Sequence, residues 1–147
     1  MPHRSAFWFF FPLRVRYAEV DQQGIVFNAH YLTYFDVGIT EYMRALGFDY
    51  QSQPERTGFD FHVVKSLVEY KAPIRFDEEI ETAVRTARLG RTSLTFELAI
   101  FGKGEEQLRA SGEIVYVNAD RASHKAAPIP SALEALIRAR EFGPSVA

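Results

Sequence analysis

The segment from about Ala29 to Leu46 constrains the fold most, because it predicts a long helix with almost no polar side. Its apolar residues recur at three- and four-residue steps, the spacing of an α-helix, over more than one face: Tyr31, Leu32, Tyr34, Phe35, Val37, Ile39, Tyr42, Met43 and Leu46. A helix that is apolar over so much of its circumference is buried rather than laid on a surface. Gly47 follows, where a residue in the left-handed conformation would end the helix. The rest of the chain must therefore cover this helix.

Four segments of alternating apolar and polar residues come after the helix. Each has one clearly more apolar face, which is typical of antiparallel strands, and they run over residues 61–72, 79–89, 92–101 and 107–117. Two glycine-containing turns connect the last three: Leu89-Gly90-Arg91 and Gly102-Lys103-Gly104. One further strand is predicted before the helix, from Leu13 to Val20, and a short final helix from Ser131, with an apolar stripe of Leu133, Leu136 and Ile137.

These elements have one economical arrangement, in which the sheet curls around the long helix. We predict an α+β fold with a central helix wrapped by a curled antiparallel five-stranded sheet. The 147 residues suffice for one complete core and contain no linker or repeat, so we expect a single domain over residues 1–147, with its core at about 13–140. The outer edges of such a sheet stay open, and pairing them across a two-fold axis is the usual way to satisfy them. We therefore expect a homodimer or a homotetramer.

Composition excludes several kinds of partner. A formal charge of −2 provides no overall basic field for nucleic acid, so a phosphate-bearing ligand would need a local basic patch. The chain has no cysteine, which excludes disulfides and thiol nucleophiles and fits a reducing, cytoplasmic location. Its four histidines lack metal-ligand spacing. We therefore expect neither nucleic acid nor a metal as a partner.

An aromatic run, Phe7 to Phe11, precedes the first predicted strand. It is too short to span a membrane, which needs about 20 apolar residues, and it lacks the long apolar core and cleavage site of a signal peptide. Two interpretations stay open: an aromatic-rich lead-in to the first strand, or an apolar patch that packs on another subunit.

The stretch RYAEVDQQGIVFNAHY, residues 16–31, contains the candidate chemistry. It begins with strand-like alternation, breaks at a polar segment that starts with Asp21, recovers three apolar residues, and breaks again at Asn28-Ala29-His30 before the helix. A lone carboxylate at the first break, with an amide and an imidazole at the second, needs an explanation. Taken alone, an Asp-x-x-Gly segment most often forms a turn in which the carboxylate binds its own backbone.

The spacing of Tyr17, Asp21 and Gly24, followed by Ile25-Val26-Phe27 and by a helix that opens Tyr31-Leu32-x-Tyr34-Phe35, resembles the hotdog-fold acyl-CoA thioesterases. Within them it is most similar to the 4-hydroxybenzoyl-CoA thioesterase-like family, including the Tol-Pal-associated branch. The resemblance covers about Leu13 to Val117 and implies a hotdog fold and hydrolysis of an acyl-CoA to a free acid and coenzyme A. It implies no cofactor, since coenzyme A is part of the substrate.

In that family the aspartate that matches Asp21 is the catalytic carboxylate, which attacks the thioester carbonyl or activates a water. A thiolate leaves readily, so the reaction mainly needs a nucleophile and a stabilised oxyanion. The first N–H groups of the long helix, near Asn28 and Ala29, lack intrahelical partners and are candidates for an oxyanion hole. Gly24 would let the chain turn between the carboxylate and the helix start.

One position departs from the family. Many members read His-Ala-Asn-Tyr at the helix start, whereas this chain reads Asn28-Ala29-His30-Tyr31, so a histidine role at the first position does not transfer. Asn28 is a candidate for a catalytic contact and equally for the helix N-cap. His30 is either a substrate contact or a packing histidine. Tyr17 is a catalytic candidate by resemblance and equally a core aromatic of the first strand.

The nucleotide end of coenzyme A needs cations and hydrogen-bond donors. Arg91 is the first candidate and Arg88 the second, and Thr92 adds a hydroxyl, because the resemblance places a phosphate contact at this turn. The alternative is that both arginines are solvated charges of a hairpin.

The sequence thus predicts an enzyme, an acyl-CoA thioester hydrolase. A non-catalytic module that binds acyl-CoA or an acyl carrier on the same fold is the alternative, since a fold does not fix a function. An acyl-CoA dehydratase of related fold ranks last, because it would need an Asp–His pair and His30 is the only histidine near Asp21.

Overall fold

The structure is a computed structural model that describes residues 2–143. Five antiparallel strands form one sheet, in the order β1-β3-β4-β5-β2. The strands are β1 (Phe9–Arg14), β2 (Phe59–Tyr70), β3 (Glu79–Leu89), β4 (Ser93–Gly102) and β5 (Leu108–Asp120). The α-helices are α1 (His30–Leu46), α2 (Gln53–Thr57) and α3 (Ser131–Glu141), and two single turns of 3-10 helix are η1 (Arg4–Ala6) and η2 (Tyr17–Glu19). Among the residues described, no helix is long and apolar enough to cross a membrane.

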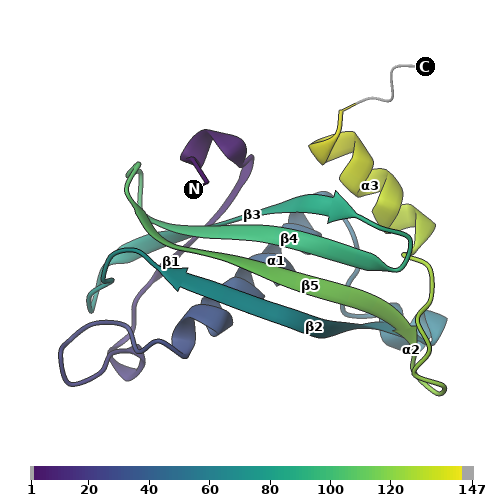
Figure 1. Cartoon of the computed structure of the whole chain (residues 1–147), viewed down its shortest axis with the longest axis horizontal. Coiled ribbons are helices and arrows are strands. Elements are labelled where there is room, and N and C mark those ends of the chain that lie inside the picture. The colour runs from purple at the N-terminus through teal and green to yellow at the C-terminus, as the bar shows by residue number, and fades with distance from the viewer. Residues whose placement is uncertain (1, 144–147) are drawn as a thin grey trace.

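Helix α1 lies along one face of the sheet and supplies much of the core (Figure 1). Its buried side chains pack against those of the central strands: Tyr34, Phe35, Ile39, Tyr42 and Met43 from α1, and Val84, Leu94, Phe96, Leu98 and Ile100 from β3 and β4. The helix ends at Gly47, whose φ of +88° favours glycine. The α+β hotdog fold predicted from the sequence is confirmed, and so are the long helix, the last four strands and the final helix.

Two glycines set how closely α1 approaches the sheet. A Cβ at Gly38 of α1 would lie 2.6 Å from Thr82 Cγ2 of β3. A Cβ at Gly112 of β5 would lie 2.8 Å from Phe35 Cζ of α1 and 2.5 Å from the carbonyl oxygen of Leu67. No real Cβ atom fits at such separations, so a side chain at either position would push the helix away from the strands.

The first strand lies earlier in the chain than predicted. β1 pairs with β3 from Phe9 opposite Val84 to Arg14 opposite Glu79, whereas the following residues turn into η2. The Arg16 N–H donates to the carboxylate of the residue three positions later at 2.8 Å, which closes a turn where the alternation suggested a strand. The prediction of a strand over residues 13–20 is therefore wrong, because a local side-chain hydrogen bond outweighs the alternating pattern.

The aromatic run supplies β1 instead and packs on both faces of the sheet. Phe7 and Phe10 contact Phe101 on the outer face, each with ring centroids 6.4 Å apart. Trp8 contacts Tyr42 on the inner face at 5.5 Å. These contacts are made within one protomer, as the lead-in interpretation predicted, and Phe7 is the first buried residue among those that the structure describes.

Strand β2 forms an open edge of the sheet. It pairs with β5 alone among the described strands, and a β-bulge interrupts the pairing between Val63 and Lys65. Val63, Val64, Leu67 and Tyr70 are all exposed along it. A long edge strand with unpaired backbone groups and exposed apolar residues is a natural place for another strand to pair.

Candidate functional site

The loop between η2 and α1 forms a small hairpin. Val20 and Val26 make an antiparallel bridge, and the chain turns at Gly24, whose φ of +76° favours glycine. The Phe27 N–H donates to the Glu19 carbonyl at 2.9 Å, so the loop closes onto η2. The loop is therefore fixed at both ends before the helix begins.

Asp21 lies in this loop and is partly exposed. Its Oδ1 accepts the Gln23 N–H at 2.8 Å, which is the turn contact that an isolated Asp-x-x-Gly segment predicts. A carboxylate has room for about four hydrogen bonds, so this contact leaves most of its acceptor capacity unused. Asp21 also lines two clefts, which therefore adjoin at this residue. The turn contact and a chemical role are compatible.

The first cleft has a volume of about 510 Å³ and lies between the loop, the start of α1 and the end of β2. Its lining residues are Asp21, Ile25, Val26, Phe27, Asn28, Tyr31, Tyr70, Lys71, Ala72 and Pro73. Within the part of the chain that the structure describes, the N–H groups of Asn28 and Ala29 donate to no protein acceptor. Asp21, which carries a carboxylate, and Asn28, which carries an unused backbone donor, therefore line one cleft, and the Ala29 N–H follows directly in the chain.

Asn28 is not the N-cap of α1. Ala29 occupies that position, and no side chain caps the helix. The His30 N–H donates to the Phe27 carbonyl at 3.0 Å, and the Tyr31 N–H donates to the Asn28 carbonyl at 3.3 Å. Backbone carbonyls of the preceding turn satisfy these donors, so the capping interpretation of Asn28 is wrong. Its exposed side-chain amide makes no hydrogen bond to another of the described residues.

The second cleft, of about 800 Å³, lies on the other side of Asp21 and contains Tyr17 and His30. Its lining residues are Tyr17, Ala18, Val20, Asp21, Gln22, Gly24, Phe27, His30 and Phe76. Tyr17 is 80% exposed, and its ring centroid lies 5.6 Å from that of Phe76. The interpretation of Tyr17 as a core aromatic is therefore wrong, because η2 directs its side chain away from the core. The ring of His30 packs against Phe27 at 6.1 Å.

Glu19, which no sequence pattern singled out, is a carboxylate buried beneath the Asp21 loop, with 6% of its surface exposed. It accepts the Arg16 N–H at 2.8 Å, the Arg16 Nε–H at 3.0 Å and the Tyr34 hydroxyl at 2.9 Å. Burial alone would raise the pKa of Glu19, but these hydrogen bonds outweigh it, so the pKa lies below its ordinary value of 4.5. The Arg16-x-x-Glu19 spacing, with the acid three residues after the start of a turn, was the available signal.

Replacing Glu19 by Gln is expected to lower the free energy of unfolding by about 1–3 kcal/mol at pH 7, because the charged hydrogen bonds to Arg16 are lost. A carboxylate with a depressed folded pKa stabilises the protein above its unfolded pKa, and this contribution disappears as the pH falls through the folded pKa. The difference in the free energy of unfolding between wild type and E19Q should therefore be largest at pH 7 and should decrease below about pH 4.5. Urea unfolding at pH 7 and at pH 3 measures it.

The matched control is Glu134→Gln, which removes a surface carboxylate that pairs with Arg138 at 3.1 Å. Because both partners are solvated, this variant should unfold within about 0.5 kcal/mol of wild type at either pH. An E19Q difference that is as large at pH 3 as at pH 7 would contradict the assigned role of the Glu19 charge.

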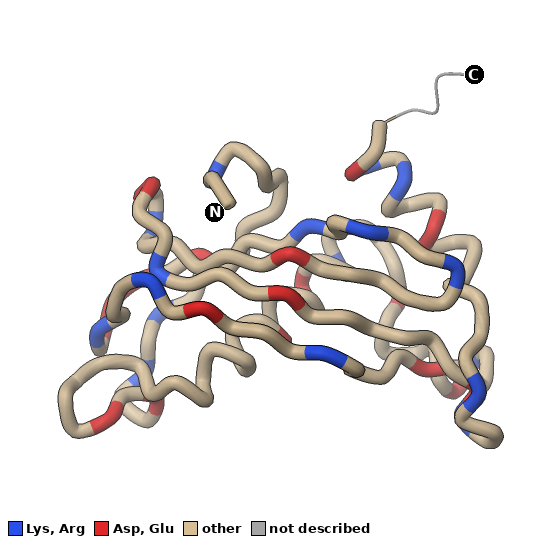
Figure 2. Tube along the Cα trace, viewed as in Figure 1, with Lys and Arg blue, Asp and Glu red and all other residues tan. Residues whose placement is uncertain are grey.

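Arg88, Arg91 and Thr92 lie at the β3–β4 turn, at the opposite end of the sheet from Asp21. The Asp21 loop adjoins the start of β3, since the Val26 N–H donates to the Ile74 carbonyl at 2.8 Å. A strand of the length of β3 spans about 33 Å, so Arg91 and Asp21 do not meet within one protomer. Figure 2 shows Lys and Arg positions around this turn, at the right-hand end of the view. Neither arginine has a carboxylate partner among residues 2–143.

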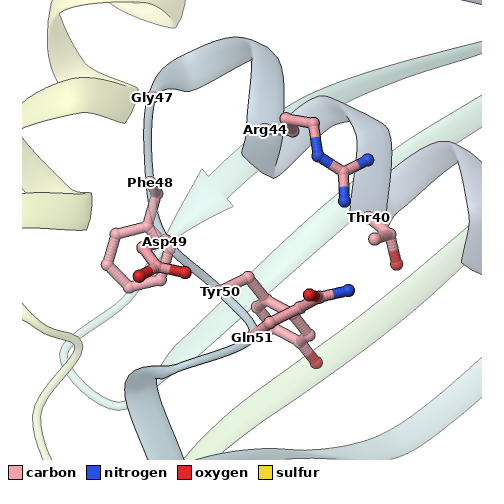
Figure 3. A pocket seen from close by; sticks show the side chains of 7 residues that line it. All are labelled: Thr40, Arg44, Gly47, Phe48, Asp49, Tyr50 and Gln51. Atoms are coloured by element: carbon pink, nitrogen blue, oxygen red, sulfur yellow. The ribbon is translucent and has the colours of Figure 1, made fainter. Parts of the chain in front are cut away.

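A further cavity, of about 300 Å³, lies at the C-terminal end of α1, away from Asp21 (Figure 3). Its charged side chains already have partners, because Arg44 binds Glu41 and Asp49 binds Ser52. No residue predicted to act on a substrate lines it. Across residues 2–143, the structure contains no cluster of three or more His, Cys, Asp or Glu side chains that could hold a metal ion.

Solved structures define the class of protein to which this fold belongs. A protein from Pseudomonas aeruginosa superposes on the chain with a TM-score of 0.84 and 33% identity, over 94% of both chains. A gentisyl-coenzyme A thioesterase superposes with a TM-score of 0.77 and 26% identity, over 88% of this chain and 99% of the other. The fold is therefore one that known thioesterases use.

Sequence comparison then gives the family. The acyl-CoA thioester hydrolase YbgC of Escherichia coli is 32% identical over 128 residues, which are 86% of this chain and 93% of that protein. Residues 15–137 match the Thioesterase-like superfamily, and the chain belongs to this family.

Proposed function

We propose that the protein hydrolyses the thioester bond of an acyl-CoA to a free acid and coenzyme A. One observation carries the proposal: Asp21 and Asn28 line a single cleft of about 510 Å³ at the start of α1, where the N–H groups of Asn28 and Ala29 donate to no acceptor among the described residues. Membership of the Thioesterase-like superfamily and the activity for which the E. coli relative is named, acyl-CoA thioester hydrolysis, support it.

In the proposed reaction the thioester carbonyl oxygen faces the N–H groups of Asn28 and Ala29. Asp21 acts as base or as nucleophile. As base it takes a proton from water while the water oxygen bonds to the carbonyl carbon; as nucleophile it forms an anhydride that water then hydrolyses. In both cases the C–S bond breaks and the thiolate of coenzyme A leaves. One oxyanion donor of this kind lowers the barrier by about 3–4 kcal/mol.

The neighbouring side chains have supporting roles in this proposal. Asn28 can hold the carbonyl or the attacking water with its free amide. Tyr17 and His30 line the second cleft on the far side of Asp21 and can contact the substrate there. Coenzyme A enters only as part of the substrate, and no other cofactor takes part.

Thiol release from short-chain, long-chain and aromatic acyl-CoAs, followed with a thiol-reactive dye, tests the function. We expect turnover with at least one of the three groups. Binding of acyl-CoA without release of thiol would contradict hydrolysis and would favour the non-catalytic module instead.

We also propose that residues 1–147 act as one domain in the cytoplasm. The absence of cysteine from the sequence fits a reducing compartment. The single sheet, which draws strands from Phe9 to Asp120, supports one domain.

We further propose a homodimer in which β2 pairs with β2 of a second copy. The open backbone edge and the exposed Val63, Val64 and Leu67 support this pairing. Antiparallel pairing across a two-fold axis would bring the Phe59 end of the partner's strand beside the Tyr70 end, which lines the Asp21 cleft. In each protomer Phe59 pairs with Asp120, so the Phe59 end of β2 lies at the same end of the sheet as the β3–β4 turn. The partner subunit's Arg91 would thus approach the coenzyme A bound at this protomer's Asp21.

Mixed dimers of Asp21→Asn and Arg91→Ala chains test this arrangement. The R91A homodimer should show a KM about tenfold higher with kcat unchanged, because one phosphate contact is lost. A heterodimer purified through two different tags contains one site with both Asp21 and Arg91 if the site is shared between protomers. It should therefore recover the wild-type KM. A heterodimer that keeps the KM of R91A, or a protein that is monomeric by light scattering, would contradict the shared site.

A further inference from the structure

The hydroxyl of Tyr70 donates a hydrogen bond to the backbone carbonyl oxygen of Asn28, at 3.2 Å. The two residues are 42 positions apart, and they join the last residue of β2 to the turn that precedes α1. Both also line the cleft that contains Asp21. A side chain of the edge strand therefore holds one specific peptide group at the start of the helix.

The peptide in question is the one that carries the Ala29 N–H. The Asn28 carbonyl and the Ala29 N–H belong to the same planar unit, so fixing the direction of the carbonyl also fixes the direction of the N–H. The Tyr31 N–H donates to the same carbonyl oxygen at 3.3 Å from the helix side. Two donors thus hold the carbonyl, while the Ala29 N–H at the other end of the peptide stays free of protein acceptors within the described residues. Hydrogen bonds to a carbonyl also polarise the amide and strengthen its N–H as a donor.

The position of the Tyr70 ring is set by the fold rather than by the loop. Tyr70 pairs with Ala110 in the β2–β5 ladder, and its ring packs edge-on against Tyr31 with centroids 4.8 Å apart. Tyr31 is buried at 4% exposure in the first turn of α1. The hydroxyl therefore comes from a rigid element, which is the condition for holding a catalytic donor in place before substrate arrives.

We propose that Tyr70 is a positioning residue, which orients the Asn28–Ala29 peptide so that the Ala29 N–H faces the oxyanion of the tetrahedral intermediate. The inference rests on the proposed thioesterase function. Tyr70 itself need not touch the reacting atoms: its hydroxyl is used by the backbone, and its effect reaches the substrate through the Ala29 N–H. Loss of the hydroxyl should weaken the oxyanion hole without changing the cleft that binds coenzyme A.

Tyr70→Phe and Tyr50→Phe form a matched pair of variants. Both remove one tyrosine hydroxyl, but Tyr50 stacks on Phe61 beyond the C-terminal end of α1 and lines neither cleft at Asp21, whereas the hydroxyl of Tyr70 holds Asn28. We expect kcat of Y70F to fall about tenfold with KM within twofold of wild type, since misorienting a donor costs less than removing it. Y50F should keep the wild-type kcat. In ¹H–¹⁵N spectra, the Ala29 amide resonance should move in Y70F and stay in Y50F.

Each other outcome decides against the proposal. A Y70F enzyme with wild-type kcat, equal losses in both variants, or a change confined to KM would overturn the positioning role of Tyr70. If wild type hydrolyses no acyl-CoA, the proposed function fails by itself. The Ala29 amide resonance then still tests the hydrogen bond between Tyr70 and Asn28. An unchanged resonance in Y70F would show that the Tyr70 hydroxyl does not hold this peptide.

Discussion

The Asp21→Asn variant is expected to retain its fold and to lose about 10³-fold in kcat for every acyl-CoA that wild type hydrolyses. An amide cannot take a proton from water or attack the thioester carbon, so neither proposed role of Asp21 survives. The turn should persist, because the Asn side-chain oxygen can still accept the Gln23 N–H that Oδ1 accepts in wild type. The KM should change little, since the proposed phosphate contacts lie elsewhere. Steady-state thiol release and a thermal unfolding curve measure both points.

The control for this variant is Asp77→Asn, the same chemical change on a neighbouring loop. Asp77 precedes β3, and its φ of +69° is one that Asn adopts readily. Its only ionic partner among the described residues is the exposed Arg14, at 3.5 Å. D77N should therefore keep the wild-type kcat. If D21N stays within threefold of wild type across the panel, Asp21 is not the catalytic carboxylate.

The second large effect concerns stability. Gly112→Ala is expected to lower the free energy of unfolding by about 3 kcal/mol or more, because the new methyl group has no space. Its Cβ would meet the ring of Phe35, which is fully buried, and would lie 2.5 Å from the backbone carbonyl of Leu67. Neither neighbour can rotate away, since one belongs to α1 and the other to the backbone of β2. Urea unfolding followed by circular dichroism measures the change.

Gly102→Ala makes the same substitution in the neighbouring strand, where the obstacle is different. The nearest atoms there belong to the carboxylate of Glu105, with Cδ at 2.6 Å, and Glu105 is exposed and able to rotate. G102A should therefore lower the free energy of unfolding clearly less than G112A does. If G112A is no more destabilised than G102A, the close approach of α1 to β5 does not limit the packing.

Local patterns predicted most of the secondary structure. The apolar spacing of residues 29–46 and the following glycine located α1 to within one residue, and one-sided alternation located β2 to β5 to within three. These patterns succeed because each reports on neighbours a few positions apart, which is the range over which a helix or strand repeats. The first strand was misplaced for the same reason, since the alternation of residues 13–20 carries no sign of the Arg16–Glu19 turn that replaces it.

The sequence predicted which residues belong to the site better than it predicted how they are arranged in space. The motif around Asp21 and the helix start predicted which groups to examine, and the structure places Asp21 and Asn28 on one cleft. The Arg16-x-x-Glu19 spacing was a signal for Glu19, but the exposure of Tyr17 and the distance of Arg91 from Asp21 were not predictable. They depend on where η2 turns and on the direction in which β3 runs.

The sequence alone predicted the secondary-structure elements of this protein: one buried helix, four one-sided strands and a polar loop with a single acid. The folded chain settled which strand lies at the open edge and which side chains meet, as Tyr70 meets Asn28 across 42 residues. The difference arises because hydrophobic periodicity is a property of adjacent residues, whereas contacts between distant ones exist only after the strands have taken their order in the sheet.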